Sequence, residues 1–273
     1  MIEMKENAIA MNPVVEVDNL CVSYGKRMVL SGVSISVAAS EILAILGVSG
    51  CGKTTLLKAM IGLLKPACGV VRLFGKEIGD VDDPETVTIL KKVGVLYQNG
   101  ALLGSLTIGE NIALPIQMHA KLSGKIISEI VQLKLTQVGL PSAAPLYPRE
   151  LSGGMRKRAA LARALALDPP LLFCDEPSAG LDPVTAAGLD DLLLKLRQDL
   201  GITIVVVTHE LASIRAIADS AIFLHKGSVY FKGILSQALG ATSGPLFDFF
   251  NRRGPSSSSG SHGRAQFVVE RTA

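Results

Sequence analysis

Hydrophobic residues recur along the chain with two different periods, and the change of period separates strands from helices. Residues 14–24 and 29–37 alternate between apolar and polar side chains, as half-buried strands do. The apolar run in 41–46 predicts a fully buried strand. Apolar residues three or four positions apart first appear in 53–64, which predicts a helix that ends before Pro66. The next elements are a strand, a helix that opens with proline and another strand, at 69–75, 84–92 and 93–98.

Helices and strands alternate more regularly in the second half of the chain. Such alternation implies right-handed crossovers and a mostly parallel sheet. Before this part, residues 99–150 carry two helical patterns, the first of which Thr107 is expected to cap, and we interpret them as a helical insertion. After it, the expected elements are helix 153–167, strand 171–174, helix 183–200, strand 202–207, a short helix after His209, and strands 220–225 and 228–233.

The composition adds limits to this picture. The 273 residues are 48% hydrophobic, which is enough for a large core. A net charge of +3 and an aromatic content of 4% argue against a nucleic-acid-binding surface, which needs a concentrated basic face or stacking rings. The mean hydropathy of +0.40 fits a large parallel-sheet core, either alone or together with an apolar docking face for a membrane partner.

The sequence shows no signal peptide or membrane span. The first 20 residues lack a basic start and a continuous apolar stretch, and the apolar runs elsewhere have the length of strands. We therefore expect a soluble protein inside the cell. Cys21, Cys51, Cys68 and Cys174 match no zinc or C-x-x-C spacing, so we expect four free thiols. Cys174 is expected to be a core residue, and Cys51 either simply fits its loop or is sensitive to oxidation.

A glycine-rich segment follows the buried strand 41–46. It fits the phosphate-binding loop G-x-x-x-x-G-K-[ST] and lies between an expected strand and an expected helix, as that motif requires. Backbone N–H groups and the positive end of the helix would bind phosphates, Lys53 would add a full charge, and the Thr54 hydroxyl would bind Mg²⁺. The segment comprises Gly47, Val48, Ser49, Gly50, Cys51, Gly52, Lys53, Thr54 and Thr55.

Two carboxylates come directly after the apolar strand 171–174, at the end of a strand where α/β sheets bind ligands. An acid pair in that position is costly to bury without a cation nearby. We expect Asp175 to hold Mg²⁺ and Glu176 to position or polarise the water that attacks a γ-phosphate.

A second potential phosphate clamp lies at the start of the helix 153–167. Ser152 is a good N-cap, and Gly153 and Gly154 leave the first backbone N–H groups bare. One nucleotide already has its glycine loop, so the simplest arrangement is a symmetric dimer in which each Ser-Gly-Gly closes on the nucleotide of the partner.

With these motifs in this order, residues 14–240 resemble the ATP-binding subunits of ABC transporters. The resemblance implies an α/β P-loop NTPase fold with a mostly parallel core sheet, an N-terminal antiparallel β subdomain and an inserted helical subdomain. It also implies that Tyr24 stacks on adenine, Gln98 senses Mg²⁺ and the membrane subunits, Asp182 lines the dimer seam and His209 contacts the γ-phosphate. Taken alone, His209 also fits a polar cap at a strand end, and Tyr24 an exposed strand residue.

The expected domain organisation follows from this resemblance. The helix at 244–253 either packs on its own core or, with the tail, reaches the other subunit or a regulator. Beyond it, 265–270 either belongs to a disordered end or adds a strand to a neighbour. The parts are an N-terminal extension (1–13), an ATP-binding RecA-like core with its β subdomain (14–98 and 151–240), the helical insertion (99–150), and a C-terminal helix with a flexible tail (241–273).

Two short features resemble a narrower branch, the ATPases of Mla/Mce-type lipid transport systems. These are Met155, where most of the family has glutamine, and the residues "GALL" at 100–103. The branch implies a homodimer, permease subunits, an Mce-type lipid-binding protein and a STAS-domain regulator, at the cytoplasmic face of the inner membrane, with no nucleic acid. The basic residues 156–158 are expected to form a solvated helix face or to contact an acidic partner.

The resulting hypothesis is an ATPase in which two copies enclose two ATP molecules, and hydrolysis lets them part. The helical insertion, entered through Gln98, would transmit this motion to the permease. One alternative is an ABC importer or exporter for amino acids, metals or another small solute. The other is a soluble ABC protein that acts on nucleic acid or ribosomes, but the sequence shows no tandem cassette, coiled-coil arm or basic patch.

Overall fold

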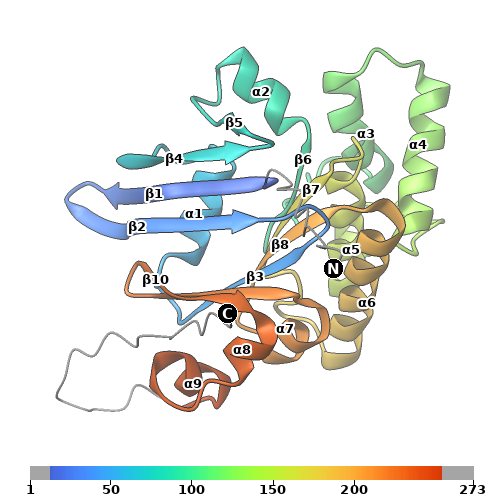
Figure 1. Ribbon diagram of the computed structural model, residues 1–273. Helices are drawn as coiled ribbons and strands as arrows, with labels where there is room; N and C mark the ends of the chain where they lie inside the picture. The colour runs from blue at the N-terminus through green and yellow to red at the C-terminus, as the bar shows by residue number, and fades with distance from the viewer. Residues whose placement is uncertain (1–12, 254–273) are drawn as a thin grey trace, which may run out of the picture.

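The computed structural model describes residues 13–253, and two sheets organise this part of the chain (Figure 1). An antiparallel sheet has the order β2-β1-β4-β5. A second sheet has the order β10-β9-β3-β8-β7-β6 and is parallel except for the pair β9 and β10. The strands are β1 (Val15–Tyr24), β2 (Arg27–Val37), β3 (Ile42–Gly47), β4 (Cys68–Leu73), β5 (Lys76–Glu77), β6 (Val93–Leu96), β7 (Leu171–Asp175), β8 (Thr203–Val207), β9 (Ser220–His225) and β10 (Ser228–Ile234).

Helices cover both faces of the second sheet. In Figure 1, α1 lies between the two sheets, and α3 to α6 stand on the other side of the second sheet. The helices are α1 (Lys53–Met60), α2 (Pro84–Leu90), α3 (Ile108–His119), α4 (Gly124–Gln137), α5 (Gly153–Ala164), α6 (Pro183–Leu200), α7 (Leu211–Ile217), α8 (Leu235–Leu239) and α9 (Gly244–Phe250), with a 3-10 turn at Pro148–Glu150.

The side chains of the central strands divide alternately between two cores. On β7, Leu171 and Phe173 pack with α1 and the antiparallel sheet, whereas Leu172 and Cys174 pack with α3 to α6. This alternation explains why these strands are apolar at every position, since both faces of a parallel sheet are covered. A third cluster joins β3 and β9 to α7, α8 and α9.

The sequence predicted the fold class correctly, and most expected elements lie within a few residues of the observed ones. Thr107 caps α3 through a reciprocal capping box with Glu110, as its sequence predicts. The first helix ends earlier than expected, at Met60, because Gly62 adopts a left-handed conformation with φ 74°. The short elements β5 and α8 were not predicted. Most of the N-terminal extension and the segment 265–270 lie outside the described residues.

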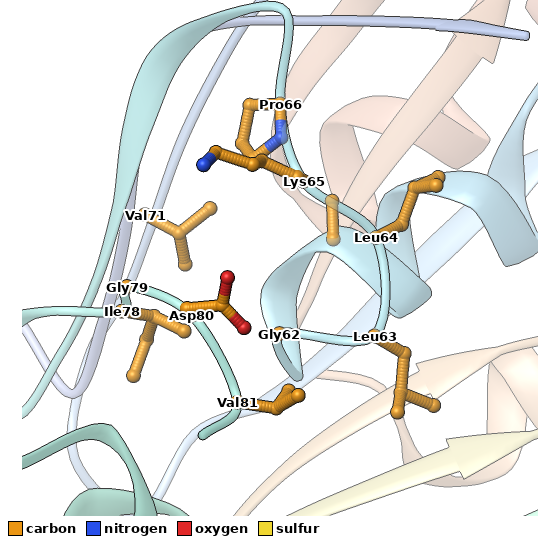
Figure 2. A pocket seen from close by; sticks show the side chains of 11 residues that line it. Gly62, Leu63, Leu64, Lys65, Pro66, Val71, Ile78, Gly79, Asp80 and Val81 are labelled. Atoms are coloured by element: carbon orange, nitrogen blue, oxygen red, sulfur yellow. The ribbon is translucent and has the colours of Figure 1, made fainter. Parts of the chain in front are cut away.

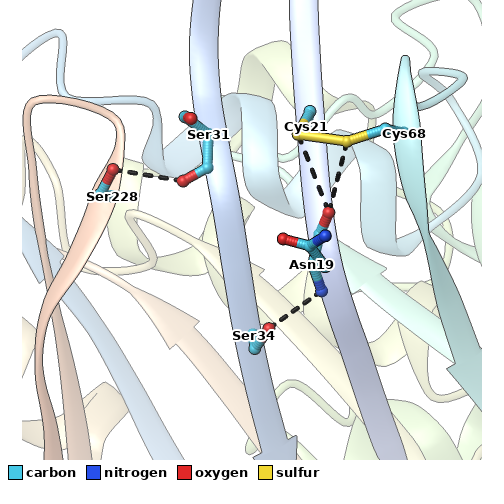
Figure 3. Close-up of a disulfide and its surroundings, with 6 residues drawn as sticks. All are labelled: Asn19, Cys21, Ser31, Ser34, Cys68 and Ser228. Atoms are coloured by element: carbon cyan, nitrogen blue, oxygen red, sulfur yellow. Dashed lines mark hydrogen bonds between the residues drawn. A yellow bond between two sulfur atoms is a disulfide. The ribbon is translucent and has the colours of Figure 1, made fainter.

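The expectation of four free thiols is wrong for one pair of cysteines. Cys21 on β1 and Cys68 on β4 form a disulfide, with their Cα atoms 4.9 Å apart (Figure 3). The two residues are partners in the antiparallel register of β1 and β4. Their separation of 47 residues matches no sequence motif, so only the strand pairing brings them together. Cys51 and Cys174 are free and buried, and burial raises the pKa of both thiols.

A short contact fastens the antiparallel sheet to the second sheet (Figure 3). The backbone N–H of Ser31 on β2 donates to the carbonyl of Gly227 at 2.9 Å, and the Ser228 hydroxyl donates to the carbonyl of Ser31 at 3.2 Å. A Cβ at Gly227 would lie 2.3 Å from the carbonyl oxygen of Val29, so this approach requires glycine. Among the helices in 13–253, none has the length and apolar character to cross a membrane.

A buried carboxylate between α6 and α7 generates a prediction about stability. Burial raises the pKa of Asp190, a shift that a hydrogen bond from Ser213 opposes, and its Oδ1 has no hydrogen-bond partner within the described residues. The folded protein therefore holds this proton more tightly than the unfolded chain, so this group costs stability as the pH rises from its unfolded-state pKa through its folded-state pKa.

We expect Asp190→Asn to raise the free energy of unfolding at pH 7 by roughly 1 kcal/mol, because it removes an uncompensated buried charge. The gain should fade as the pH falls below about 4, near the pKa of Asp in the unfolded chain. Urea unfolding at a series of pH values measures this. Asp191→Asn, at the exposed neighbouring position, is the control and should change stability less. Equal stability of the wild type and Asp190→Asn at neutral pH would contradict the prediction.

Candidate functional site

The glycine-rich loop leaves β3 at its carboxyl end and enters α1. Gly47 has φ 152°, and a Cβ there would lie 2.5 Å from Cys51 Sγ and 2.6 Å from the carbonyl oxygen of Leu224. Gly50 and Gly52 have φ of 76° and 107°, in the range that glycine favours. Gly52 is the N-cap of α1 and supplies no side chain to its first N–H groups, which stay available for an anion.

Lys53 lies folded over the loop that precedes it. Its Nζ donates to the carbonyl oxygens of Gly47 at 2.8 Å and Val48 at 3.3 Å, and the residue is only 9% exposed. The ammonium is therefore held against the loop backbone, where phosphate oxygens could replace the two carbonyls as its acceptors.

A hollow of about 760 Å³ lies over this loop. That volume is in the range of pockets that enclose small-molecule ligands. Of the expected site residues, those that line it come from the glycine loop, from Gln98 after β6, from Glu176 after β7 and from His209 after β8. The lining comprises Val29, Gly47, Val48, Ser49, Gly50, Gly52, Lys53, Thr54, Thr55, Gln98, Glu176, His209, Glu210, Leu211, Phe249 and Arg252.

The remaining expected residues do not line this hollow. Cys51 is buried beneath the loop, and Tyr24 is half exposed at the end of β1. Asp175 is buried at the end of β7. The others lie at the starts of α5 and α6: the exposed N-caps Ser152 and Asp182, and the first two residues of α5, Gly153 and Gly154.

Glu176 and His209 form a hydrogen-bonded pair at the edge of the hollow. Glu176 Oε1 lies 2.7 Å from His209 Nδ1, and the backbone N–H of Glu176 donates to the carbonyl of Val207 at 2.8 Å. Glu176 has φ 47°, a left-handed conformation that is costly for a residue with a side chain. The strand register and this turn together aim the carboxylate at the hollow, and Glu176 Oε2 stays buried without a hydrogen-bond partner in 13–253.

Asp175 carries a buried carboxylate whose negative charge a bound cation would compensate. Its Oδ1 is a second buried oxygen without a partner in the described part of the chain. Burial raises the pKa of Asp175, and the charge of Glu176 raises it further, while Lys53 and other lysines nearby lower it. Carboxylate oxygens and the exposed Thr54 hydroxyl are ligands that suit Mg²⁺. Residues 13–253 contain no cluster of three or more His, Cys, Asp or Glu that would enclose a metal.

The turns before α5 and α6 lie against each other on the surface. The Ser152 hydroxyl accepts from the Met155 N–H at 3.3 Å, which makes Ser152 the expected N-cap of α5. Asp182 caps α6 by accepting from the N–H groups of Val184 and Thr185. A Cβ at Gly154 would lie 2.4 Å from Thr185 Cγ2, so glycine allows the two turns to approach closely.

The interpretation of residues 156–158 as a solvated face is wrong for two of the three. Lys157 is 7% exposed, and its Nζ donates to the carbonyl oxygens of Gln98 and, at 3.1 Å, Glu176. Arg158 donates to the carbonyl oxygens of Val138 and Gly188. Burial lowers the pKa of Lys157, and the negative charges of Asp175 and Glu176 act against that shift. Only Arg156 is exposed.

The C-terminal helix α9 and the residues that follow it add two lining residues that sequence reasoning missed, Phe249 and Arg252. Leu246 and Phe250 anchor α9 in the core, and the Phe249 ring packs 5.3 Å from that of Phe223 on β9. Of the two alternatives for this helix, the structure shows packing on its own core. Sequence reasoning had no signal that Phe249 and Arg252 share a hollow with the glycine loop, because that depends on tertiary packing.

A second hollow, of about 210 Å³, lies between the end of α1 and the segment after β5 (Figure 2). Its lining is mostly apolar, with Lys65 and Asp80 as its charged members. It is smaller than the roughly 300 Å³ at which pockets for drug-sized ligands begin, and it contains none of the expected site residues.

Comparisons with known proteins agree with this arrangement. The sequence pattern of the family described as "ABC transporter" matches residues 30–179. Over 226 residues, the chain is 40% identical to "Intermembrane phospholipid transport system ATP-binding protein MlaF" of Haemophilus influenzae, and the match covers 83% of this chain and 86% of that protein. It is 38% identical over 239 residues to "Probable ribonucleotide transport ATP-binding protein mkl" of Mycobacterium bovis, covering 88% of this chain and 67% of that one.

Solved structures show the same fold. The ATP-binding cassette MJ0796, in a dimeric post-hydrolysis state bound to ADP and Pi, superposes with a TM-score of 0.75 at 33% identity, covering 81% of this chain and 98% of that one. The cbiO1 protein of Clostridium perfringens, part of the cbiONQ transporter complex, has a TM-score of 0.77 at 27% identity, covering 84% and 91%.

The glycine loop generates a prediction with a matched control. Gly47→Ala should destabilise the protein by about 3 kcal/mol, because the new Cβ meets both a sulfur and a backbone oxygen. Gly50→Ala shares the unfavourable φ but has nothing within 4 Å of its Cβ, so about 1 kcal/mol is expected. Urea denaturation measures both values. A larger loss of stability in Gly50→Ala than in Gly47→Ala would contradict this conformation of the loop.

Proposed function

The chain belongs to the ABC transporter family of ATP-binding proteins, and on that premise we propose that it powers phospholipid transport across the cell envelope. As an ABC ATPase it hydrolyses ATP to ADP and phosphate, and this hydrolysis is coupled to transport. The observation that carries the lipid assignment is the similarity to MlaF of Haemophilus influenzae along most of both chains. Met155 and the residues at 100–103 support the same branch.

We infer that the hollow over the glycine loop holds the ATP phosphates. The first N–H groups of α1 bind the phosphate oxygens, and Lys53 turns from the carbonyls of Gly47 and Val48 to the β- and γ-phosphates. Tyr24 lies outside this hollow, at the end of β1, and we assign it to stacking on the adenine that projects from it.

Glu176 and His209 act on the attacking water in this proposal. The hydrogen bond between His209 Nδ1 and Glu176 Oε1 fixes the plane of the carboxylate. Glu176 Oε2, which has no partner in the described residues, is then the atom that accepts a hydrogen bond from the water and polarises it toward the γ-phosphate. His209 lines the same hollow, and we assign it to sensing the loss of this phosphate.

Asp175, Thr54 and Gln98 are the residues we propose to hold Mg²⁺ with the nucleotide. When bound, the cation neutralises charge on the β- and γ-phosphates. The unpartnered Oδ1 of Asp175 and the raised pKa of this carboxyl are the observations that favour a cation beside it.

The exposed turns before α5 and α6 are assigned to a homodimer seam. Ser152, Gly153 and Gly154 do not line the hollow of their own chain, as expected if they complete the hollow of the partner. Asp182 lies beside them on the same surface. The dimeric MJ0796 cassette, a structural relative, provides a precedent for pairing.

We propose that the ATPase dimer binds permease subunits at the cytoplasmic face of the inner membrane. We assign this contact to the helical insertion, since a hollow of about 330 Å³ is lined by residues of β6, α3 and the end of α5. Tyr97 and Met118 are among its lining residues. An Mce-type lipid-binding protein and a STAS-domain regulator would complete the complex.

Glu176→Gln should retain ATP binding but reduce turnover by about 10²- to 10⁴-fold, because the amide cannot accept the proton from water. With ATP bound and unhydrolysed, this variant should accumulate as a dimer. Phosphate release and light scattering measure the two effects, and Lys53→Ala, which loses the phosphate charge, should neither bind nor dimerise. Near-normal turnover of Glu176→Gln would overturn the assigned role.

The proposed homodimer seam is tested in the Glu176→Gln variant. Adding Ser152→Arg to Glu176→Gln should abolish the ATP-dependent dimer while ATP binding persists. Ser123→Arg is the matched control, since Ser123 is also an exposed N-cap, at the start of α4, but lies outside the proposed seam. A dimer that survives Ser152→Arg contradicts the seam.

The substrate is tested by isolating the chain with its membrane partners and extracting what they hold. We expect phospholipid in the extract, and ATPase activity of the complex in nanodiscs that the Lys53→Ala variant lacks. A nucleotide or an amino acid in place of lipid, with ATPase activity intact, would reject phospholipid and leave an ABC transporter of another class. The ribonucleotide assignment in the name of mkl makes nucleotides the first competitor to assay.

A further inference from the structure

Lys157 joins two loops at the catalytic edge of the sheet. It lies one turn into α5, and its buried ammonium donates to the carbonyl oxygens of Gln98 and Glu176. These two carbonyls belong to the segments that leave the adjacent strands β6 and β7. One side chain from the helix that begins at Ser152 therefore contacts the backbone of both segments.

The two carbonyls lie at equivalent positions just beyond the ends of β6 and β7. Leu96 on β6 and Cys174 on β7 are partners in the parallel register, and Gln98 and Glu176 each lie two residues further along. The pairing of β6 and β7 ends before these residues. Lys157 thus bridges the two segments just beyond the point where the strand pairing stops. Its ammonium carries three donors, so one side chain can fix the distance between both segments.

Lys157 also interacts with nearby negative charges. The Lys157 ammonium interacts with the charges of Asp175 and Glu176, which are buried beside it. A charge in such a position is costly unless others compensate it. Removing Lys157 would leave two carbonyls short of a donor and two carboxylates short of a positive charge.

We propose that Lys157 is a positioning residue for ATP hydrolysis, which holds the Gln98 and Glu176 segments in register and ties them to the helix that begins at Ser152. The inference rests on the proposed function of Glu176 and Gln98. Ser152 caps the helix that carries Lys157, so a shift of this helix is passed on to the backbone of Glu176. Neither of these two hydrogen bonds involves the glycine loop. We therefore expect the loop to keep its contacts with the nucleotide when Lys157 is replaced.

The test is the steady-state kinetics of the full chain carrying Lys157→Met, which keeps the length of the side chain but removes its charge and donors. We expect kcat to fall by about 10- to 100-fold, the scale that about 1 Å of misplacement produces, with ATP affinity within about threefold of the wild type. Lys157→Arg retains the charge and several donors and should recover most of the loss. Unchanged kcat, or a loss that resides in ATP affinity, would overturn the inference.

Lys134→Met is the matched control. Lys134 on α4 is 1% exposed and forms an ion pair with Asp168, away from the hollow, so its loss should lower thermal stability and leave kcat of the folded protein unchanged. An equal fall of kcat in Lys134→Met would show that Lys157 acts through general stability, and would overturn the inference as well.

A double variant gives a second readout. In Gln98→Ala/Lys157→Met, the losses in kcat should be smaller than the product of the single losses, because both changes disturb the same segment. If Lys157→Met does not fold, the same cycle with Lys157→Gln decides the question, and independent losses contradict the inference. A wild-type protein without ATPase activity would instead contradict the proposed function.

Discussion

The parallel register of four adjacent strands is the constraint on which the rest of the structure depends. β6, β7, β8 and β3 run in the same direction, so their carboxyl ends meet at one edge of the sheet. Asp175 is paired with Val207, and Ile45 is also paired with Val207, which places the acid pair, the segment before His209 and the glycine loop within two strands of one another. A shift of the pairing register by one residue would move every side chain of a strand to the opposite face of the sheet. Both faces are packed core here, so such a shift would disrupt both cores. The apolar packing therefore sets the geometry of the polar edge.

That edge has to balance charges that are largely shielded from water. Asp175 and Glu176 are buried next to each other, and Lys53 and Lys157 approach them from opposite sides, one from the glycine loop and one from α5. Two carboxylate oxygens have no hydrogen-bond partner in the described residues. Such an arrangement is poor for stability and suited to a site that receives a cation, phosphates and water together. The left-handed Glu176 is consistent with this, because strain persists where the surrounding structure imposes it.

The sequence predicted what depends on local pattern and missed what depends on tertiary contact. The strands, the glycine loop and the caps at Thr107 and Ser152 are local features, and the structure contains them. The disulfide between Cys21 and Cys68 arises from strand pairing across 47 residues, which no spacing rule reveals. Lys157 was misjudged for a similar reason. In the sequence it is the middle of three basic residues, whereas in the fold its rotation about α5 turns it inward, toward carbonyls that the ends of β6 and β7 leave free.

The surface turns give a physical reason why hydrolysis would depend on a second subunit in the proposed dimer. Ser152 and Asp182 are exposed caps, yet both are connected to the interior. The helix that Ser152 begins carries Lys157 to Glu176, and Ser178, near Asp182, has its hydroxyl 3.4 Å from that of Ser213 on α7, the helix that follows His209. The start of α5 is thus connected to Glu176 through Lys157, and the segment before α6 is connected to α7, which starts two residues after His209. In the proposed dimer, a partner that contacts both turns would therefore constrain the Glu176 carboxylate through its hydrogen bond to His209.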